Sequence, residues 1–407
     1  MLVVLSLLAC KDPAATQGKA VEVGADDPVW DPQSLPIYKL TLPSDWEAQL
    51  TAAIPTDECA DRASILGQLD YANPQSGKSE HYTDVGVRYR GHSALSEGQR
   101  FGFKLLFDAP DPDARFHDEK HINLLGTEGD FSLLHERLAL GLMDSMGVPA
   151  GKVIHSRVYV NDAFLGIFPV SQEPDDQAFV DDHFEKEGGH LYKVAGYCGG
   201  SGDFEYKSAD AGDYDEKYVA KAGTLPEDAT SDLIPLLQCA AGNDAALQTC
   251  LPTHIDVEEW LTEMAVDAVL PDIDGLAGAG QNFMLYHDPV TSTFVVYPYD
   301  KDQSFYTSSL ESDSIFDFHP PWAEPSTLSL RMRELWKADY CARVDETVDA
   351  YAKIPAKVDD LIEFLRPYMA TDPYIDPHSW EAQAADIKAI VPSHGAEVRD
   401  QAEACAP

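Results

Sequence analysis

The chain has 407 residues, with 70 Asp and Glu against 29 Lys and Arg, which gives a formal net charge of −41. Such a surface repels nucleic acid and anionic lipid headgroups, so the composition excludes both as binding partners of the folded part. The length, together with 44% apolar residues, is enough to bury the core of one large domain or two lobes and argues against disorder.

The N-terminus has the features of an export signal. An apolar run ends in Leu-Leu-Ala-Cys at residues 7–10, which resembles a bacterial lipobox, and the run is too short to span a bilayer. We therefore expect residues 1–10 to be a lipoprotein signal peptide with Cys10 as the lipidation site, and residues 11–35 to be a flexible spacer. An ordinary signal peptide is the alternative. The expected location is outside the cytoplasm, at the cell envelope or surface, with membrane contact through the N-terminal lipid anchor only.

The other six cysteines predict three disulfides, because an even number is typical of exported proteins. Proximity in sequence favours Cys239–Cys250 and Cys341–Cys405, which leaves Cys59–Cys198. The chain has no CxxC pair, which argues against a zinc site.

The first half of the chain reads mainly as antiparallel sheet. Apolar and polar residues alternate in several segments, as in strands with one solvated face. A hairpin is expected over residues 156–170, with Asn161-Asp162 as its turn. A short helix capped by Ser44 follows the first strand. The strands expected before the hairpin span residues 37–43, 83–95, 100–108 and 120–126.

One long helix interrupts this sheet-rich half, at residues 130–149. Leu134, Leu138 and Leu142 recur every four residues along one face. Asp130 is placed to cap the helix, and Gly147 to end it.

The second half reads as helical with one strand pair. Residues 196–230 are rich in Gly, Asp and Ala and are expected to form a loop region. An amphipathic helix is predicted at 255–270, a hairpin at 282–300, and further helices over most of 329–404. The pattern predicts an α+β protein whose first part is rich in sheet and whose second part is rich in helix.

A basic cluster stands out in this acidic chain. Arg88, Arg90, Arg100 and Lys104 lie between Gly86 and Lys104, with one acidic residue among them. Such a cluster is typical of a site for an anion such as phosphate. The alternative is the solvated face of a strand with ordinary ion pairs.

Two further residues would suit a nucleotide site. Glu173 ends the predicted hairpin, and Lys193 follows an apolar pair in "GGHLYK". A buried Glu–Lys pair of this kind can orient a lysine that binds phosphate.

Carboxylates and an amide cluster around the second hairpin. Asp274 and Asn282 flank a glycine-containing loop before it, and Asp300 and Asp302 follow it in "YPYDKDQSF". Hard oxygen ligands of this kind hold the metal ion of phosphoryl-transfer enzymes. The alternatives are a solvated turn and a structural Ca²⁺ site.

In this order the motifs resemble the spore-coat protein H (CotH) kinase family, a set of atypical protein kinases. The resemblance covers about residues 36–403 and rests on "VRYRGHS", "DFSLLHERLALGLMDSMGVPA", "RVYVNDAFLGIFPVSQEPDDQAFV", "GGHLYK", "QNFMLY" and "FVVYPYDKDQSF". It implies a kinase-like domain over residues 36–407, with a two-lobed fold. The sheet-rich N-lobe would span about 36–195 and the helix-rich C-lobe about 196–407.

The resemblance also implies roles for these residues. Asp274 would be the catalytic base, and Asn282 and Asp300 would hold Mg²⁺, or Mn²⁺ in its place, with Asp302 beside them. The ATP phosphates would contact Lys104 or Lys193, helped by Arg88 or Arg90.

The function implied by the resemblance is transfer of the γ-phosphoryl group of ATP to Ser or Thr of a protein substrate. An exported lipoprotein lies where ATP is scarce, so we also consider a surface adhesin, or binding lipoprotein, on an inactive kinase-like scaffold. The presence of Asp274, Asn282 and Asp300 together favours the enzyme.

Overall fold

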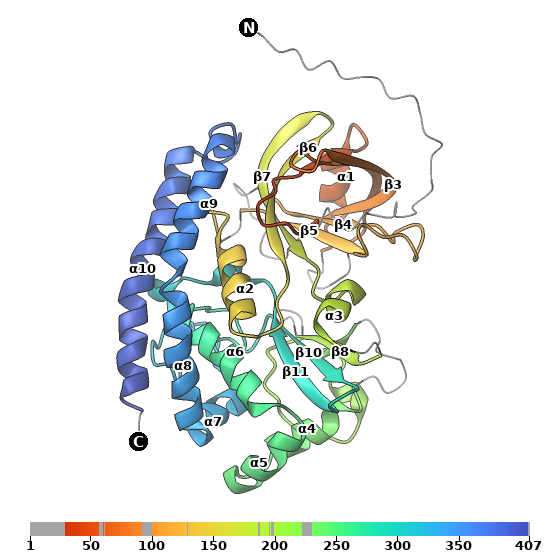
Figure 1. Cartoon of the computed structure of the whole chain (residues 1–407). Coiled ribbons are helices and arrows are strands. Elements are labelled where there is room, and N and C mark those ends of the chain that lie inside the picture. Colours follow the sequence, from red (N-terminus) through yellow and green to blue (C-terminus); the bar gives the residue numbers. More distant parts are fainter. Residues whose placement is uncertain are drawn as a thin grey trace.

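The computed structural model describes residues 29–56, 60, 62–91, 100–127, 129–185, 188–194, 196, 199–221 and 230–405. The fold is mixed α+β, as predicted. It consists of a closed barrel, a separate four-stranded sheet and a group of helices (Figure 1). Cys10, Cys59 and Cys198 lie outside the described residues, as does the predicted signal peptide.

Seven strands close the barrel in the order β1-β2-β3-β4-β5-β7-β6, and the parallel pairing of β1 with β6 completes it. Apolar and aromatic side chains fill its interior, with Tyr38, Tyr71 and Phe116 in contact through their ring edges and faces. The strands are β1 (Ile37–Thr41), β2 (Ile65–Asn73), β3 (Lys78–Tyr89), β4 (Phe103–Leu106), β5 (His121–Leu124), β6 (Val153–Val160) and β7 (Ala163–Gln172).

The predicted hairpin in this barrel is confirmed as β6 and β7. Asn161 and Asp162 form its two-residue turn with φ of 50° and 69°. Positive φ at both positions is what a type I′ turn requires, and Asn and Asp adopt it more readily than most residues.

The second sheet has the order β11-β10-β8-β9. The hairpin predicted at 282–300 supplies its β10–β11 pair, and β8 pairs antiparallel with β10. The loop region expected at 196–230 contributes a short edge strand, β9. The strands are β8 (His190–Val194), β9 (Val219–Ala220), β10 (Phe283–Asp288) and β11 (Thr293–Pro298).

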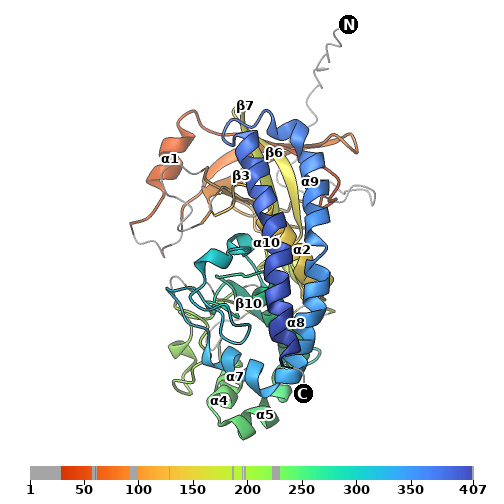
Figure 2. The same ribbon diagram turned by 90° about the vertical axis from the view of Figure 1, so that its left-hand side faces the viewer.

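Helices cover this sheet and extend alongside the barrel. Figure 2 shows α10 running past both sheets, with α9 beside its upper part and α8 beside its lower part. Among the described residues, no helix combines the length and apolar character needed to cross a bilayer. The helices are α1 (Trp46–Ala52), α2 (His135–Ser145), α3 (Gln177–His183), α4 (Leu233–Ala240), α5 (Asp244–Cys250), α6 (Val257–Val269), α7 (Thr327–Leu335), α8 (Lys337–Tyr351), α9 (Ile354–Met369) and α10 (Pro377–Glu403), with 3-10 turns η2 (Ala211–Asp213), η3 (Leu251–Thr253), η4 (Lys301–Gln303) and η5 (Thr307–Ser309).

The helix ends refine two of the capping predictions. The cap predicted at Ser44 is wrong, because Asp45 is the N-cap residue of α1 and no side chain caps this helix. The helix predicted from residue 130 begins at His135, and Asp130 accepts a hydrogen bond from the His135 backbone N–H at 2.8 Å. Gly147 follows the helix with φ of +82°, the left-handed conformation that ends many helices.

Two of the predicted disulfides are confirmed. Cys239–Cys250 joins α4 to α5, and Cys341–Cys405 joins α8 to the residues that follow α10. The second disulfide therefore fixes the C-terminal end of the long helix to the rest of the helical group.

Candidate active site

A cavity of about 310 Å³ lies where the barrel meets the four-stranded sheet. Residues from both sheets and from α2 line it. Most of the predicted site residues are among them, namely Arg88, Arg90, Lys104, Glu173, Lys193, Asn282 and Asp300. The structure therefore brings together side chains that lie more than two hundred positions apart in the sequence.

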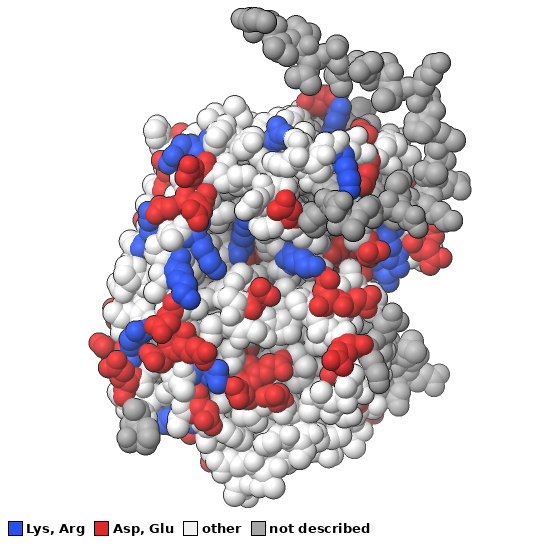
Figure 3. Space-filling view, viewed as in Figure 1, with Lys and Arg blue, Asp and Glu red and all other residues white. Residues whose placement is uncertain are grey.

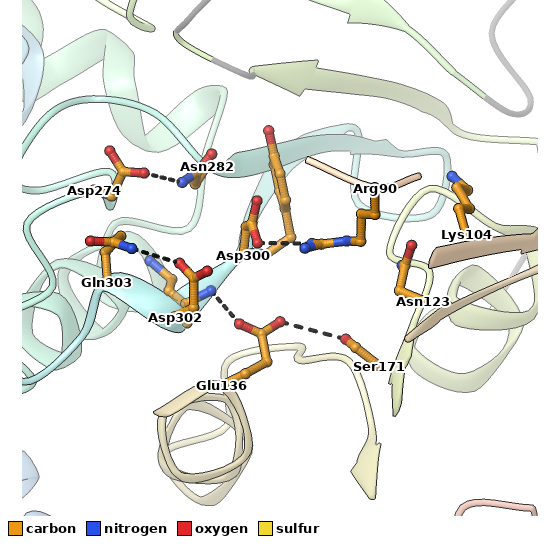
Figure 4. Close-up of polar contacts among 12 residues, drawn as sticks. Arg90, Lys104, Asn123, Glu136, Ser171, Asp274, Asn282, Asp300, Asp302 and Gln303 are labelled. Carbon is orange, nitrogen blue, oxygen red and sulfur yellow. Dashed lines mark hydrogen bonds and ion pairs between the residues drawn. The ribbon is translucent and has the colours of Figure 1, made fainter. Parts of the chain in front are cut away.

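Arg90 and Asp300 form an ion pair in this cavity (Figure 4). Arg90 follows β3, and Asp300 lies two residues after β11 in the left-handed conformation, with φ of 58°. The Arg90 Nη2 donates to Asp300 Oδ1 at 2.8 Å, and the side chains are 22% and 32% exposed. Desolvation opposes ionisation of Asp300, but the charges of Arg90 and Lys193 outweigh it and lower its pKa. Asp300 is therefore a carboxylate that faces the cavity in its charged form.

A second ion pair is more deeply buried. Lys104 Nζ in β4 lies 2.5 Å from Glu173 Oε2, directly after β7, and Asn123 donates to the same oxygen at 3.0 Å. Burial would raise the pKa of Glu173, but Lys104 and Lys193 hold it well below its usual value. Glu173 therefore pairs directly with Lys104, and not with Lys193, the partner that the sequence suggested.

Lys193, the other predicted lysine, lies over an aromatic ring. Its Nζ is 4.3 Å from the centre of the Tyr299 ring, and the Tyr299 hydroxyl donates to the Val194 carbonyl at 3.0 Å. Burial lowers the pKa of Lys193, although Asp175 and Glu173 act against it. The two lysines thus enter the cavity from different sheets.

Asp274 lies beside the cavity without lining it, and it contacts Asn282, which does line it. Its carboxylate accepts a hydrogen bond from Asn282 Nδ2 at 2.7 Å and another from the Gln281 side chain (Figure 4). Asn282 lines the cavity itself. Burial, with the negative charges of Asp272 and Asp300, raises the pKa of Asp274 to about 7. A carboxyl with that pKa exchanges protons readily near neutral pH.

Asp302 is not among the residues that line the cavity with Asp300. It lines a smaller cavity of about 30 Å³, which shares Arg90 and Glu136 with the larger one. Its carboxylate accepts from Gln303 at 3.3 Å, and its carbonyl oxygen contacts His135 Nδ1 at 2.9 Å. Asp302 thus takes no part in lining the larger cavity.

Glu136 in α2 is a site residue that sequence reasoning missed. Its Oε2 accepts the Lys301 backbone N–H at 2.5 Å, and its Oε1 accepts from Ser171 at 3.5 Å (Figure 4). Burial and the charge of Asp300 raise its pKa to about 7. The sequence carried no signal of this role, because Glu136 lies between His135 and Arg137 and resembles part of a solvated helix end.

Lys301 is the second residue that was missed. Its Nζ lies 2.8 Å from Asp267 Oδ1 in α6 and 2.5 Å from Asp272 Oδ2, and all three side chains are fully buried. These ion pairs connect the turn that carries Asp300 to the loop that carries Asp274. A lysine between two aspartates reads as a solvated turn, so the sequence carried no signal of burial.

The cavity is a local concentration of positive charge in an acidic protein. Three acidic residues line it, Glu136, Glu173 and Asp300. On the face of the molecule shown in Figure 3, by contrast, acidic and basic side chains are mixed. The basic residues of the lining are Arg62, Arg88, Arg90, Lys104, Lys193 and Lys221.

Six cations around a cavity whose lining also offers carboxylate and amide oxygens suit an anionic ligand such as a phosphate ester. The sequence matches the family described as CotH kinase protein over residues 87–391, so the chain belongs to this family. The resemblance read from the sequence motifs is thereby confirmed.

A solved structure is also similar to this chain, the crystal structure of the proinflammatory kinase CtkA of Helicobacter pylori. Its identity is 9% and its TM-score is 0.37, over 74% of this chain and 93% of that chain. No curated protein matches the sequence.

Proposed function

We propose that this protein is an ATP-dependent protein kinase that transfers the γ-phosphoryl group to Ser or Thr of a protein substrate. The observation that carries the proposal is the placement of Asn282 and Asp300 at one end of the cavity lined by six cations. Membership of a kinase family supports it. In this proposal the barrel part, to about residue 195, and the helical part after it act as the two lobes of a kinase-like fold.

The basic residues of the cavity would bind the phosphates of ATP. Lys104 is held by Glu173 at 2.5 Å, so its ammonium group is already oriented when the nucleotide arrives. Lys193, Arg88 and Arg90 line the same space and add positive charge. Positioning and charge neutralisation of this kind account for most of phosphoryl-transfer catalysis.

The donor set at the Asp300 end fits a hard cation. Asp300 has a lowered pKa and is a charged carboxylate, and the Asn282 amide nitrogen donates to Asp274, which leaves its carbonyl oxygen as a ligand. Asn282 and Asp300 would therefore hold Mg²⁺, or Mn²⁺ in its place. When bound, the ion would neutralise phosphate charge.

Asp274 would act as the base in this proposal. The acceptor hydroxyl oxygen forms a bond to the γ-phosphorus while the bond from that phosphorus to the bridging oxygen breaks, and ADP leaves with the electron pair. The hydroxyl proton passes to the Asp274 carboxylate. A pKa of about 7 makes this carboxylate a stronger proton acceptor than an ordinary aspartate.

Export is also part of the proposal. Two disulfides are typical of proteins outside the cytoplasm and support export, and the lipobox-like residues 7–10 favour a lipid anchor at Cys10. The protein substrate would then lie in the same compartment.

The test is phosphoryl transfer from γ-labelled ATP by the purified chain, with Mg²⁺ and with Mn²⁺. We expect autophosphorylation or phosphorylation of a generic acceptor protein, and we expect Asp300→Asn and Asp274→Asn each to reduce the rate at least about 100-fold. Lys104→Ala should weaken ATP binding.

A matched control is Asp162→Asn. It removes a carboxylate from the exposed ion pair with Lys39, far from the cavity residues in the fold, and Asn suits its left-handed turn position. This variant should keep full activity. Absence of both ATP binding and transfer with either metal would overturn the kinase proposal and favour a binding protein on the same scaffold. Binding of Ca²⁺ without nucleotide would favour a structural ion.

A further inference from the structure

A group of metal-ligating side chains lies on the sheet face opposite the cavity. His190 in β8 and His287 in β10 are directly opposite each other in the antiparallel pairing, so their side chains share one face. Lys193, three residues after His190, lies on the other face with the cavity. The group is therefore separate from the candidate active site.

Asp232 completes the group. It precedes α4, but its side chain does not cap that helix and turns instead toward the two imidazoles. Its Oδ2 lies 2.9 Å from His190 Nδ1 and 2.7 Å from His287 Nδ1. Two nitrogens and one oxygen thus converge from three different elements of the fold.

We propose that His190, Asp232 and His287 form a binding site for a divalent transition-metal ion of the Zn²⁺ type. Two imidazoles and one carboxylate are a common set of three protein ligands for such an ion, which leaves one position for water. Ligand atoms around tetrahedral Zn²⁺ lie about 3.3 Å apart. The three atoms here lie within 4.8 Å of one another and two of their separations are 2.7 and 2.9 Å, so small side-chain movements suffice.

The surroundings hold these ligands in place. The Tyr192 hydroxyl donates to the second oxygen of Asp232. The His287 ring stacks on Phe294 at 4.4 Å and is also hydrogen-bonded to the Ser292 backbone. Metal-binding histidines usually have a second hydrogen bond of this kind, which fixes the ring and its tautomer.

The site is reachable from solvent yet partly enclosed. The side chains of His190 and His287 are 40% and 29% exposed, whereas Asp232 is 15% exposed. The lack of a CxxC pair does not bear on it, because no cysteine is needed. A second group, His121 with Glu173 and Asp175, shares Glu173 with the active-site cavity, where Lys104 already neutralises that carboxylate.

The role that follows is structural. A bound ion would connect β8, β10 and the start of α4, and it would therefore stabilise the helical part beneath the sheet. Because two of three ligands are imidazoles, the site should prefer Zn²⁺ and Co²⁺ over Ca²⁺ and Mg²⁺.

The test uses the untagged full chain, made metal-free with a chelator and titrated with Zn²⁺ by calorimetry and with Co²⁺ by visible absorption. We expect one equivalent to bind, with a rise in Tm that grows with Zn²⁺ concentration. His287→Gln and His190→Gln should each weaken binding about 100-fold or more, and Tyr192→Phe about 10-fold. Ca²⁺ should not compete.

Two controls separate this site from others. His81→Gln removes a histidine that lies 2.7 Å from Asp70 but belongs to no group of three metal-ligating side chains among the described residues, and it should bind Zn²⁺ normally. Asp300→Asn should also bind Zn²⁺ normally, because the cavity is on the other face. His190 is exposed enough for His190→Gln to fold, which circular dichroism would check. No stoichiometric binding by the unaltered chain, or undiminished binding by His190→Gln and His287→Gln, would overturn the proposal.

Discussion

At the scale of single residues, Lys301 shows how a buried charge can organise a site without facing it. Its ammonium group neutralises Asp267 and Asp272 in the protein interior. Glu263 lies nearby, and burial together with the negative charge of Asp267 raises its pKa well above the usual value. Removing the lysine would leave two unpaired carboxylates in a region that already holds a third.

Lys301→Met is therefore expected to destabilise the protein by about 3–5 kcal/mol at pH 7, the usual cost of leaving a buried charge unpaired. The loss should shrink as the pH falls from 7 to 5, because protonation of the freed carboxylates removes the repulsion. Urea unfolding at several pH values measures both effects. Lys337→Met, which breaks an exposed pair with Glu334, should change stability by less than about 1 kcal/mol. Equal effects of the two substitutions would contradict this account.

Asp274 carries a prediction about pH that rests on the kinase proposal. Its raised pKa means that it is protonated, and unable to accept a proton, below about pH 7. The rate of transfer should therefore rise between pH 6 and 8, with a midpoint near 7, as the carboxylate forms. The pH profile of kcat/KM for ATP, which reports the ionisations of the free enzyme, measures this midpoint.

Glu136 has a similar pKa, so its variant tests the assignment. Burial, Asp272 and Asp300 are the main causes of the Asp274 shift, and Glu136 is not among them. Glu136→Gln should then keep the midpoint near 7 even if the rate falls. A profile that is flat from pH 6 to 8, or that loses its midpoint in Glu136→Gln, would assign the titration elsewhere.

At the scale of elements, the two disulfides close chain loops of different length. Cys239 and Cys250 are 11 positions apart, whereas Cys341 and Cys405 are 64 apart. A longer loop loses more conformational freedom when it is closed in the unfolded chain. The loop-entropy relation gives about 3 kcal/mol for the first disulfide and about 4 kcal/mol for the second.

Cys341→Ser/Cys405→Ser should accordingly lower the free energy of unfolding more than Cys239→Ser/Cys250→Ser, by about 1.5 kcal/mol. Denaturant unfolding of both double variants without reductant measures the difference. The same comparison under reducing conditions is the control, since the unaltered protein should then approach the variants. A larger loss from the shorter loop would show that native packing, rather than loop closure, dominates.

Elements with a local signal could be predicted, and pairings between distant segments could not. The hairpin of β10 and β11 and the helix α6 follow from alternation and helical periodicity within one segment. The barrel closes because β1 pairs with β6. Lys193 lies in the second sheet because its strand, β8, pairs with β10. Nothing within either strand specifies its partner.

The candidate site divides in the same way. Asp300, Asn282 and Lys104 could be found because carboxylate, amide and basic residues stand out next to strands. Glu136 and Lys301 could not, because their importance comes from burial and from contacts across the fold. The order of the motifs along the chain was enough to suggest the family. Which lysine contacts Glu173 could be seen only in the structure.

At the scale of the whole molecule, the charge of −41 and several buried carboxyls make stability depend on pH. Burial raises the pKa of Glu119 and Glu259 to about 8. Glu136 and Asp274 have values near 7. The folded state thus holds protons that the unfolded chain releases near pH 4. Their contribution to stability is complete below that pH and is lost as the pH rises through 7 to 8.

Below pH 6.5, buried histidines change the stability of the fold in the opposite direction. Burial lowers the pKa of His155 to about 3 and also lowers that of His394, so these histidines resist the charge that the unfolded chain would take up. Their contribution is lost as the pH falls. Between pH 6.5 and 8 the buried carboxyls therefore set the slope, and self-repulsion of the acidic surface adds to it.

The free energy of unfolding should then fall between pH 6.5 and 8, and Glu119→Gln should make the fall smaller by about 1.5 kcal/mol. Glu119 is 2% exposed, and a glutamine has no proton to lose while it can still accept from Trp30 and Gln172. Urea unfolding at constant ionic strength measures the slope, and higher salt should reduce only the part that comes from surface repulsion. Glu334→Gln, at an exposed position, should keep the slope of the unaltered protein. If Glu119→Gln and Glu334→Gln have the same slope, surface charge alone governs the pH dependence and the buried carboxyls do not.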